Sequence, residues 1–158
     1  MKLLSASILC FSLLSLTACK PDEDSLSPAG YDTLAQDIGY WEWQSNQTRG
    51  SLLTPATVGF SRQLLFDTNN QLTIYHDGQV YSQVPFQLSV GLRPSCGSPQ
   101  SAVPLVLYTA EPQIWNDDLK TYWVEVTPTG QTLHLEGAAA CVDAGQHEAY
   151  VWHAGHAL

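Results

Sequence analysis

The residues of this chain that could most readily bind a metal ion are three histidines and two acids near its C-terminus. His147, His153 and His156 lie close in sequence to Asp143 and Glu148. A zinc site needs three or four such ligands at fixed geometry, and the first two histidines share a face only if their strand is regular. We therefore expect solvated histidines at a strand end and predict no metal site.

A second polar cluster consists of Trp115, Asn116, Asp117 and Asp118. Carboxylates beside an aromatic ring could bind calcium or a sugar, but Asn and Asp also favour turns because their side chains hydrogen-bond to nearby backbone groups. We expect a turn here. Together with the loop over residues 91–104, it is a candidate for contact with a protein partner.

Motifs of catalysis and cofactor binding are missing from the sequence. The chain contains no Gly-x-Ser-x-Gly, no phosphate-binding loop and no His-Glu-x-x-His. The segment from Asp67 to Gln71 begins like a calcium loop, but the glycine and glutamate that such a loop needs further on do not follow. We predict a protein without enzymatic activity and without a cofactor.

The N-terminus has the layout of an export signal. Lys2 precedes an apolar run from Leu3 to Leu16, and a positive charge followed by a short apolar segment is typical of secretory signals. As a helix this run would reach roughly 21 Å, which is short of the ~30 Å hydrocarbon core of a bilayer. We therefore expect a cleaved signal and not a permanent membrane helix.

Residues 16–19 read Leu-Thr-Ala-Cys and resemble the lipobox of bacterial lipoproteins. This resemblance implies that residues 1–18 form a signal peptide and that Cys19 becomes the lipidated N-terminus of the mature chain. Anchoring by two or three acyl chains would be stable, whereas one chain binds a membrane only marginally. Residues 19–30 are polar and are expected to form a flexible tether.

The residues after the expected lipidation site indicate in which membrane of the cell envelope the protein is anchored. Lys20 stands where inner-membrane retention signals usually place Asp, and the sequence CKPDED resembles export tags of surface lipoproteins in some Gram-negative groups. We expect a lipid-anchored protein of the outer membrane of a Gram-negative bacterium. Its periplasmic face and the cell surface both remain open.

Cys96 and Cys141 are the cysteines that remain after Cys10 leaves with the signal peptide and Cys19 is lipidated. In an exported chain such a pair is most simply a disulfide. Closing a loop of about 46 residues would stabilise the fold by roughly 4 kcal/mol in the chain-entropy model.

The chain is acidic, with 15 Asp and Glu against 6 Lys and Arg and a net charge of −9. This balance disfavours nucleic acids and anionic lipid surfaces as partners, because both are negatively charged. We predict no nucleic-acid partner.

Alternation of apolar and polar residues predicts one all-β domain over residues 31–158. The alternation is clear from Trp41 onward, and Asp77-Gly78 between two such runs indicates a hairpin. About eight strands joined by short turns predict an antiparallel up-and-down barrel, with a β-sandwich as the alternative. A short helix is expected over Asp32–Ile38, since Asp32 can cap it and Gly39 can end it.

A short helix that leads into Gly39-Tyr40-Trp41 resembles the Gly-x-Trp signature at the first strand of lipocalins. The segments TPATVGFSR at 54–62 and FDTNNQL at 66–72 resemble further features of bacterial lipoproteins with lipocalin-like (calycin-type) domains. The resemblance covers roughly Tyr31 to His153 and implies an eight-stranded barrel.

Two functions follow from this resemblance. The first is a binding module for a small apolar ligand, whose barrel would be lined by Trp41, Trp43, Arg62, Phe86 and Tyr122. In this function Arg62 would meet a carboxylate of the ligand or contact Trp41, unless a bulge turns it to solvent. The alternative is a barrel filled by its own side chains, whose loops bind or inhibit another envelope protein such as a lysozyme or a protease. An eight-stranded barrel is wide enough for either state.

Overall fold

The computed structural model of this protein describes residue 34 and residues 39–92, 102–111, 117–137, 140 and 145–155. The expected signal peptide, tether and lipidated Cys19 lie outside the described residues. So do Cys96 and Cys141, and, apart from Leu34, the expected short helix before Gly39.

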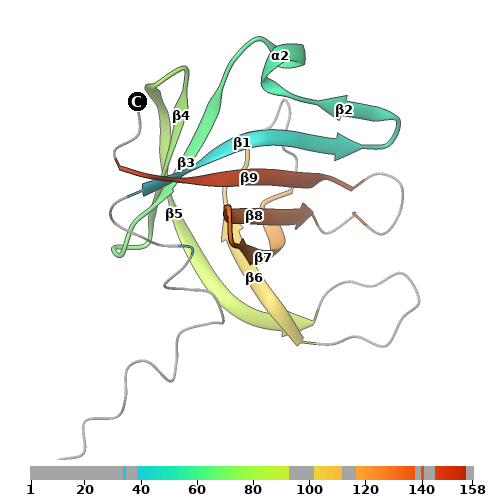
Figure 1. The fold of residues 1–158 in the computed structure, drawn as a ribbon. Coiled ribbons are helices and arrows are strands. Elements are labelled where there is room, and N and C mark those ends of the chain that lie inside the picture. Colours follow the sequence, from blue (N-terminus) through green and yellow to red (C-terminus); the bar gives the residue numbers. More distant parts are fainter. Residues whose placement is uncertain are drawn as a thin grey trace, which may run out of the picture.

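The described residues form nine strands and one short helix (Figure 1). Their bounds are β1 (Gly39–Thr48), β2 (Ser51–Leu53), α2 (Pro55–Val58), β3 (Arg62–Phe66), β4 (Gln71–His76), β5 (Gln79–Leu92), β6 (Ala102–Tyr108), β7 (Leu119–Thr127), β8 (Gly130–Gly137) and β9 (His147–Ala154). Among these residues no helix has the length and apolar character needed to cross a membrane.

Eight of the strands close into an antiparallel barrel. The sheet order is β2-β1-β3-β4-β5-β6-β7-β8-β9, and β1 also pairs with β9 along its length, from Gly39 opposite Ala154 to Gln47 opposite His147. The short β2 is an extra strand that pairs with the last residues of β1. The predicted eight-stranded antiparallel barrel is confirmed, and the β-sandwich alternative is wrong.

Turn residues set the tight connections of the barrel. Asp77 and Gly78 join β4 to β5 with φ values of 49° and 75°, the left-handed conformation that two-residue hairpin turns require and that Asp and Gly tolerate. The turn between β3 and β4 uses Asp67, whose Oδ1 accepts hydrogen bonds from the backbone N–H groups of Asn69 and Gln71 at 2.8 Å. The Asp77-Gly78 hairpin predicted from the sequence is therefore confirmed.

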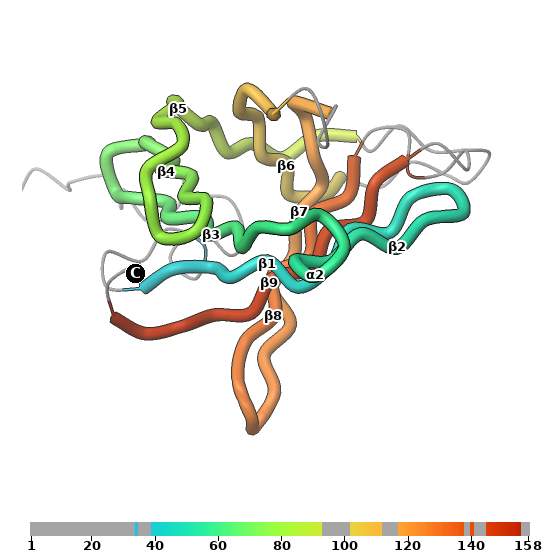
Figure 2. The backbone as a smooth tube through the Cα atoms, turned by 90° about the horizontal axis from the view of Figure 1, so that it is seen from above, coloured from blue at the N-terminus to red at the C-terminus, as the bar shows by residue number. Residues whose placement is uncertain are grey.

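Because neighbouring strands are antiparallel, the connections lie alternately at two ends of the barrel. We call the end where β1 begins and β9 finishes the proximal end; it also carries the β3–β4 and β7–β8 turns. The other end, the distal end, carries the β4–β5 turn and the connections after β1, β6 and β8. Figure 2 shows the β7–β8 hairpin projecting from the body of the barrel.

The apolar core fills the barrel from its proximal end. Trp41 and Leu64 face each other across the β1–β3 pair, and both are fully buried. The Trp41 indole N–H donates to the carbonyl of Leu34 at 3.1 Å, and the Trp41 ring packs edge-on against Trp152 of β9 at 5.0 Å. A side-chain carbon at Gly39 would overlap the Trp152 ring. The absence of a side chain at position 39 therefore leaves the room that the Trp152 ring occupies.

A bulge in β1 changes which side chains face inward. The β1–β9 register shifts between Trp43 and Ser45, so Asn46 follows Trp43 into the interior and is fully buried. The bulge thus adds a polar side chain to the interior near the distal end, beside its register partner Glu148.

Candidate functional site

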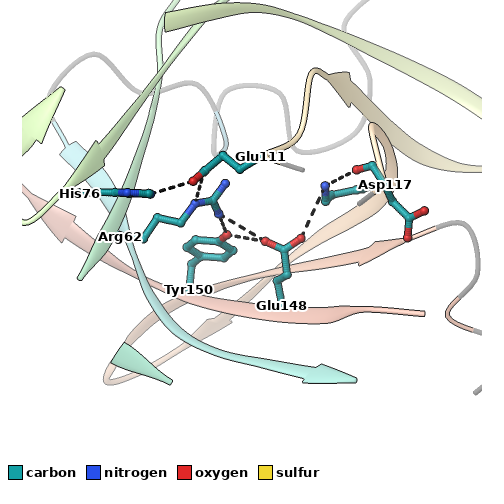
Figure 3. Close-up of polar contacts among 7 residues, drawn as sticks. Arg62, His76, Glu111, Asp117, Glu148 and Tyr150 are labelled. Carbon is teal, nitrogen blue, oxygen red and sulfur yellow. Dashed lines mark hydrogen bonds and ion pairs between the residues drawn. The ribbon is translucent and has the colours of Figure 1, made fainter. Parts of the chain in front are cut away.

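A cluster of charged side chains lies inside the distal end of the barrel (Figure 3). Each of its members lies on or just after a different strand, close to the point where that strand begins or ends. Arg62 begins β3, His76 ends β4, Glu111 follows β6, Lys120 is the second residue of β7 and Glu148 the second of β9. Antiparallel closure brings these five strand ends to one end of the barrel.

Arg62 and Glu111 form the first ion pair of this cluster. Arg62 Nε donates to Glu111 Oε1 at 2.7 Å, and both side chains are buried. The other Glu111 oxygen, Oε2, lies 2.8 Å from His76 Nε2. Glu111 therefore connects a buried cation to a histidine that is 20% exposed at the rim of the barrel.

A second carboxylate, that of Glu148, lies between the two buried cations. Glu148 Oε2 is 3.4 Å from Arg62 Nη1, and Glu148 Oε1 is 3.6 Å from Lys120 Nζ. The Tyr150 hydroxyl accepts a hydrogen bond from Arg62 Nη1 and donates to Glu148 Oε2. Lys120 Nζ also donates to the backbone carbonyl of Asp117. The cluster thus runs without a break from His76 to Asp117.

Two tyrosine rings lie against the cations. Lys120 Nζ is 4.7 Å from the centre of the Tyr108 ring, and the Arg62 guanidinium carbon is 5.8 Å from the centre of the Tyr150 ring. Such contacts add cation–π attraction where the cation has lost its water. The sequence left open whether Arg62 faces inward or is turned to solvent by a bulge, and the structure shows it facing inward, with no exposed surface.

The charged side chains of the cluster can be buried because each cation lies next to a carboxylate. The buried Arg62 and Lys120 are matched by Glu111 and Glu148, and isolated buried ions would each cost several kcal/mol. Burial disfavours the protonated form of Arg62, but the neighbouring Tyr150, Tyr108, Glu148 and Glu111 outweigh it and raise the pKa. The pKa of Lys120 is likewise raised, because Tyr108 and Glu148 outweigh the effect of burial. Both side chains therefore carry their charge inside the barrel.

His76 lies in an aromatic stack at the rim. Its ring is sandwiched between Phe60, with ring centres 4.3 Å apart, and Tyr81, at 4.2 Å. Partial burial lowers the pKa of His76 from its ordinary value, an effect that Arg62 reinforces and Glu111 opposes. His76 thus lies between the buried Glu111 and the exposed Tyr81.

The five side chains expected to line a ligand cavity are all buried in the barrel. Their exposed fractions are 0% for Trp41, Trp43 and Arg62, 1% for Tyr122 and 2% for Phe86. A side chain with no accessible surface adjoins no space that admits a water molecule. The space around Trp41, Trp43 and Arg62 is therefore filled by protein. Tyr122 and Phe86 are almost as deeply buried, and Phe66 meets Phe86 edge-on at 5.1 Å.

The expected partner loop is described in part. Trp115 and Asn116 lie outside the described residues. The Asp117 carbonyl binds Lys120, and Asp118 Oδ1 accepts a hydrogen bond from the backbone N–H of Ala110 at 2.8 Å. Both aspartates thus have structural contacts, as expected for a turn, and Asp118 remains exposed.

Asp118 also lines a shallow hollow on the outer wall of the barrel. The hollow has a volume of about 310 Å³ and lies over β5 and β6; it is lined by Pro85, Gln87, Leu107, Tyr108, Thr109 and Asp118. Leu107 pairs with Leu119 of β7 in the register of the sheet, and both are exposed. Four residues further along β7, on the same face of the strand, Trp123 stacks on His134 at 4.7 Å.

The C-terminal histidines lie apart from the interior cluster. His147 Nδ1 is 3.0 Å from Glu136, and His153 Nε2 is 2.9 Å from Glu42. His156 and Asp143 lie outside the described residues. Within the described part of the chain, no three His, Cys, Asp or Glu side chains are grouped so that they could hold a metal ion.

Sequence reasoning missed most of the interior cluster. Lys120 lies two residues before the inward Tyr122, and Glu148 two before the inward Tyr150, so strand parity could have placed both inside. Glu111 follows the end of β6, where no periodicity applies. Its role could not have been inferred from the pattern.

Comparison with protein-family models, with curated proteins and with solved structures found no match to this chain.

Proposed function

We propose that this protein is a lipid-anchored protein of the bacterial envelope, with a lipocalin-like barrel that acts by binding another protein with its outer surface. The observation that carries this proposal is the close packing around the five side chains that were expected to line a ligand cavity. The five side chains that would line a ligand cavity are at most 2% exposed, so a small apolar ligand would have to displace packed core.

The interior charges support the same conclusion. Arg62 was the candidate for a ligand's carboxylate, but Glu111 and Glu148 already bind it. A ligand acid would have to compete with two buried carboxylates of the chain itself. The cluster instead holds the distal ends of the strands together, and it thereby positions the connections between those strands.

The contact surface that we propose is the outer wall of β6 and β7. Leu107, Leu119 and Trp123 are 42%, 37% and 41% exposed there, and the hollow beside Leu107 reaches Asp118. Exposed apolar side chains next to a concavity are typical of sites for protein partners. Asp118 joins this wall to the loop at 115–118 that the sequence indicated for partner contact.

Charge favours a basic partner. The chain carries a net charge of −9, and Asp118 and Glu125 lie on or next to the proposed wall. Complementary charge speeds association and disfavours wrong partners. The partner that we propose is therefore a basic protein of the envelope, which this chain would bind as an inhibitor or an adaptor.

Two measurements on the mature chain purified from the envelope test this function. Native mass spectrometry and solvent extraction are expected to recover no organic molecule beyond the acyl groups on Cys19. A photo-crosslinking residue at Trp123 is expected to capture one discrete protein, while the same residue at the exposed Gln83 on the β4–β5 wall is not. A stoichiometric apolar molecule released from the barrel would favour the ligand carrier instead.

A further inference from the structure

We infer that two copies of this chain associate through an unpaired edge of β5, which joins its counterpart as an antiparallel strand pair across a two-fold axis at Val90. The inference goes beyond the proposed function, because it concerns an edge of the sheet and not the outer wall of β6 and β7. It depends neither on the lipid anchor nor on the protein partner.

β5 is longer than the strand beside it, so that part of one edge has no partner strand. β4 pairs with β5 only as far as Pro85, whereas β5 continues to Leu92 and pairs with β6 along this second half. Figure 1 shows β5 running on with β6 past the end of β4. In the part of the chain that the structure describes, no strand pairs with the other edge of residues 87–92.

The backbone groups on this edge can accept another strand. The N–H of Phe86 donates to the carbonyl of Asn70 at 3.0 Å, so the backbone of Phe86 points toward the β4 side. Every second residue of a strand directs its N–H and C=O to the same edge, and the next such residues are Leu88, Val90 and Leu92. Their backbone groups form an unpaired row, which is a template for pairing with another chain.

The features that usually prevent pairing at an edge are absent from this strand. Natural edge strands are commonly protected by charged side chains, by proline or by a short length. β5 contains no Asp, Glu, Lys, Arg or His, and its only proline, Pro85, precedes the unpaired row. Val90 and Leu92 are instead 58% and 61% exposed. The edge thus offers both hydrogen-bonding groups and apolar surface to an extended segment.

The residue pattern of the edge fits a second copy of itself. With the two-fold axis at Val90, this residue lies opposite its own copy, and Leu88 lies opposite Leu92 of the other chain. All three side chains are on one face of the strand, so that aliphatic groups meet across the axis. An axis at Leu88 would place Val90 opposite Phe86, whose N–H is already bonded to Asn70. Val90 is therefore the centre of the row.

Charge opposes contact between two copies less at β5 than elsewhere. The chain has a net charge of −9, but repulsion between exposed charges is screened beyond about 8 Å at physiological ionic strength. β5 and its neighbour β6 contain none of the charged residues. β7 pairs with β6 only as far as Thr121, but its later residues include Glu125, a charged residue of the kind that discourages pairing at an edge.

The test measures self-association of the full mature chain, purified in detergent, by sedimentation equilibrium. We expect a monomer–dimer equilibrium that Val90→Asp weakens at least about tenfold, because like charges directly opposite each other destabilise a strand pair. The matched control is Val126→Asp at a 69% exposed valine of β7, which should change the dissociation constant less than about twofold. A parent chain that stays monomeric at about 100 μM, or equal weakening by both variants, would overturn the inference.

Disulfide crosslinking tests the register. The pairing puts the two copies of residue 90 about 5.5 Å apart between Cα atoms, within the range of about 4.4–6.8 Å that a disulfide spans. Oxidation of Val90→Cys is expected to give a covalent dimer, and the chain without an added cysteine gives the background. Val80→Cys is the control, because Val80 is 61% exposed but lies where β5 pairs with β4. Equal crosslinking at both positions, or none at Val90→Cys, would exclude this interface.

Hydrogen exchange separates strand pairing from contact of side chains alone. The amides of Leu88 and Leu92 are expected to exchange at least about tenfold more slowly in the dimer of the parent chain than in the Val90→Asp monomer. The amides of Ser89 and Gly91 point toward β6 and should exchange equally in both. Equal exchange of Leu88 and Leu92 in dimer and monomer would show that the copies do not pair through their backbones.

Discussion

Arg62 and Glu148 are 86 positions apart in the sequence, yet Arg62 Nη1 lies 3.4 Å from Glu148 Oε2 inside the barrel. Both side chains are fully buried, and Tyr150 bridges them. Because β3 and β9 are separate strands of a closed sheet, this pair exists only when the barrel is complete. It joins the first and last parts of the domain through charge.

Removing Arg62 should destabilise the protein strongly. Arg62→Met keeps most of the volume but leaves Glu111 and Glu148 without their shared cation, and breaking a buried pair typically costs about 3–5 kcal/mol. Urea unfolding followed by tryptophan fluorescence measures the loss. The matched control is Arg49→Met in the exposed turn after β1, which should stay within about 0.5 kcal/mol of the parent. A loss below about 1 kcal/mol for Arg62→Met would contradict the network.

Lys120 and Glu148 should show coupled effects. Each of Lys120→Met and Glu148→Gln leaves a buried charge unmatched, whereas the double variant removes both charges of the 3.6 Å pair. Coupling energies between contacting residues are about 0.5–3 kcal/mol. We expect the double variant to be more stable than the sum of the single losses predicts. Strict additivity in a double-mutant cycle would show that the two side chains act independently.

His76 should make stability depend on pH below neutrality. Its pKa is lowered by burial from 6.5, so the unfolded chain binds a proton that the folded protein does not. The contribution of neutral His76 is therefore complete above about pH 6.5 and falls as the pH drops, by at most about 1.4 kcal/mol per pH unit.

Unfolding free energies at pH 7.5 and 5.5 measure this dependence. We expect the stability of His76→Gln to decline less steeply with falling pH than that of the parent. An unaltered slope in His76→Gln would assign the acid sensitivity to other groups.

Gly39 should tolerate no side chain while Trp152 is present. A methyl group at Gly39 would overlap the Trp152 ring, and overpacking typically costs about 1–3 kcal/mol. Thermal unfolding of Gly39→Ala should show this loss, and Trp152→Leu should make the same substitution nearly neutral. A Gly39→Ala effect of equal size in both backgrounds would point to the backbone and not to the ring.

Phe86→Trp should distinguish a filled barrel from a hollow one. Phe86 packs edge-on against Phe66 and is 2% exposed, so the larger ring should cost about 1–3 kcal/mol by overpacking. The protein's capture of a partner through the outer wall should persist in the folded fraction. Unchanged or increased stability would mean that the interior has room for a ligand.

Local sequence patterns were sufficient for the strands and the turns, but they left a closed barrel and a β-sandwich both open. The alternation in β1 and the Asp77-Gly78 turn are readable along the chain, because strand faces and turns depend on residues two to four positions apart. The same parity placed Trp41, Phe86 and Arg62 inside. Parity could not say whether the interior was hollow, since this depends on how side chains from opposite walls fill the space between them.

The sequence by itself therefore determined the strand pattern, the turns and the inward faces. Its local motifs also predict export and the lipidation of Cys19. Tertiary structure decided which inward polar groups meet. Glu111 lies in the connection after β6, Lys120 lies near the start of β7, and Glu148 lies near the start of β9. They meet Arg62 of β3 at one end of the barrel only when the sheet closes through the pairing of β1 and β9. These contacts depend on the closure of the sheet, and closure cannot be read from residues that are only a few positions apart in the sequence.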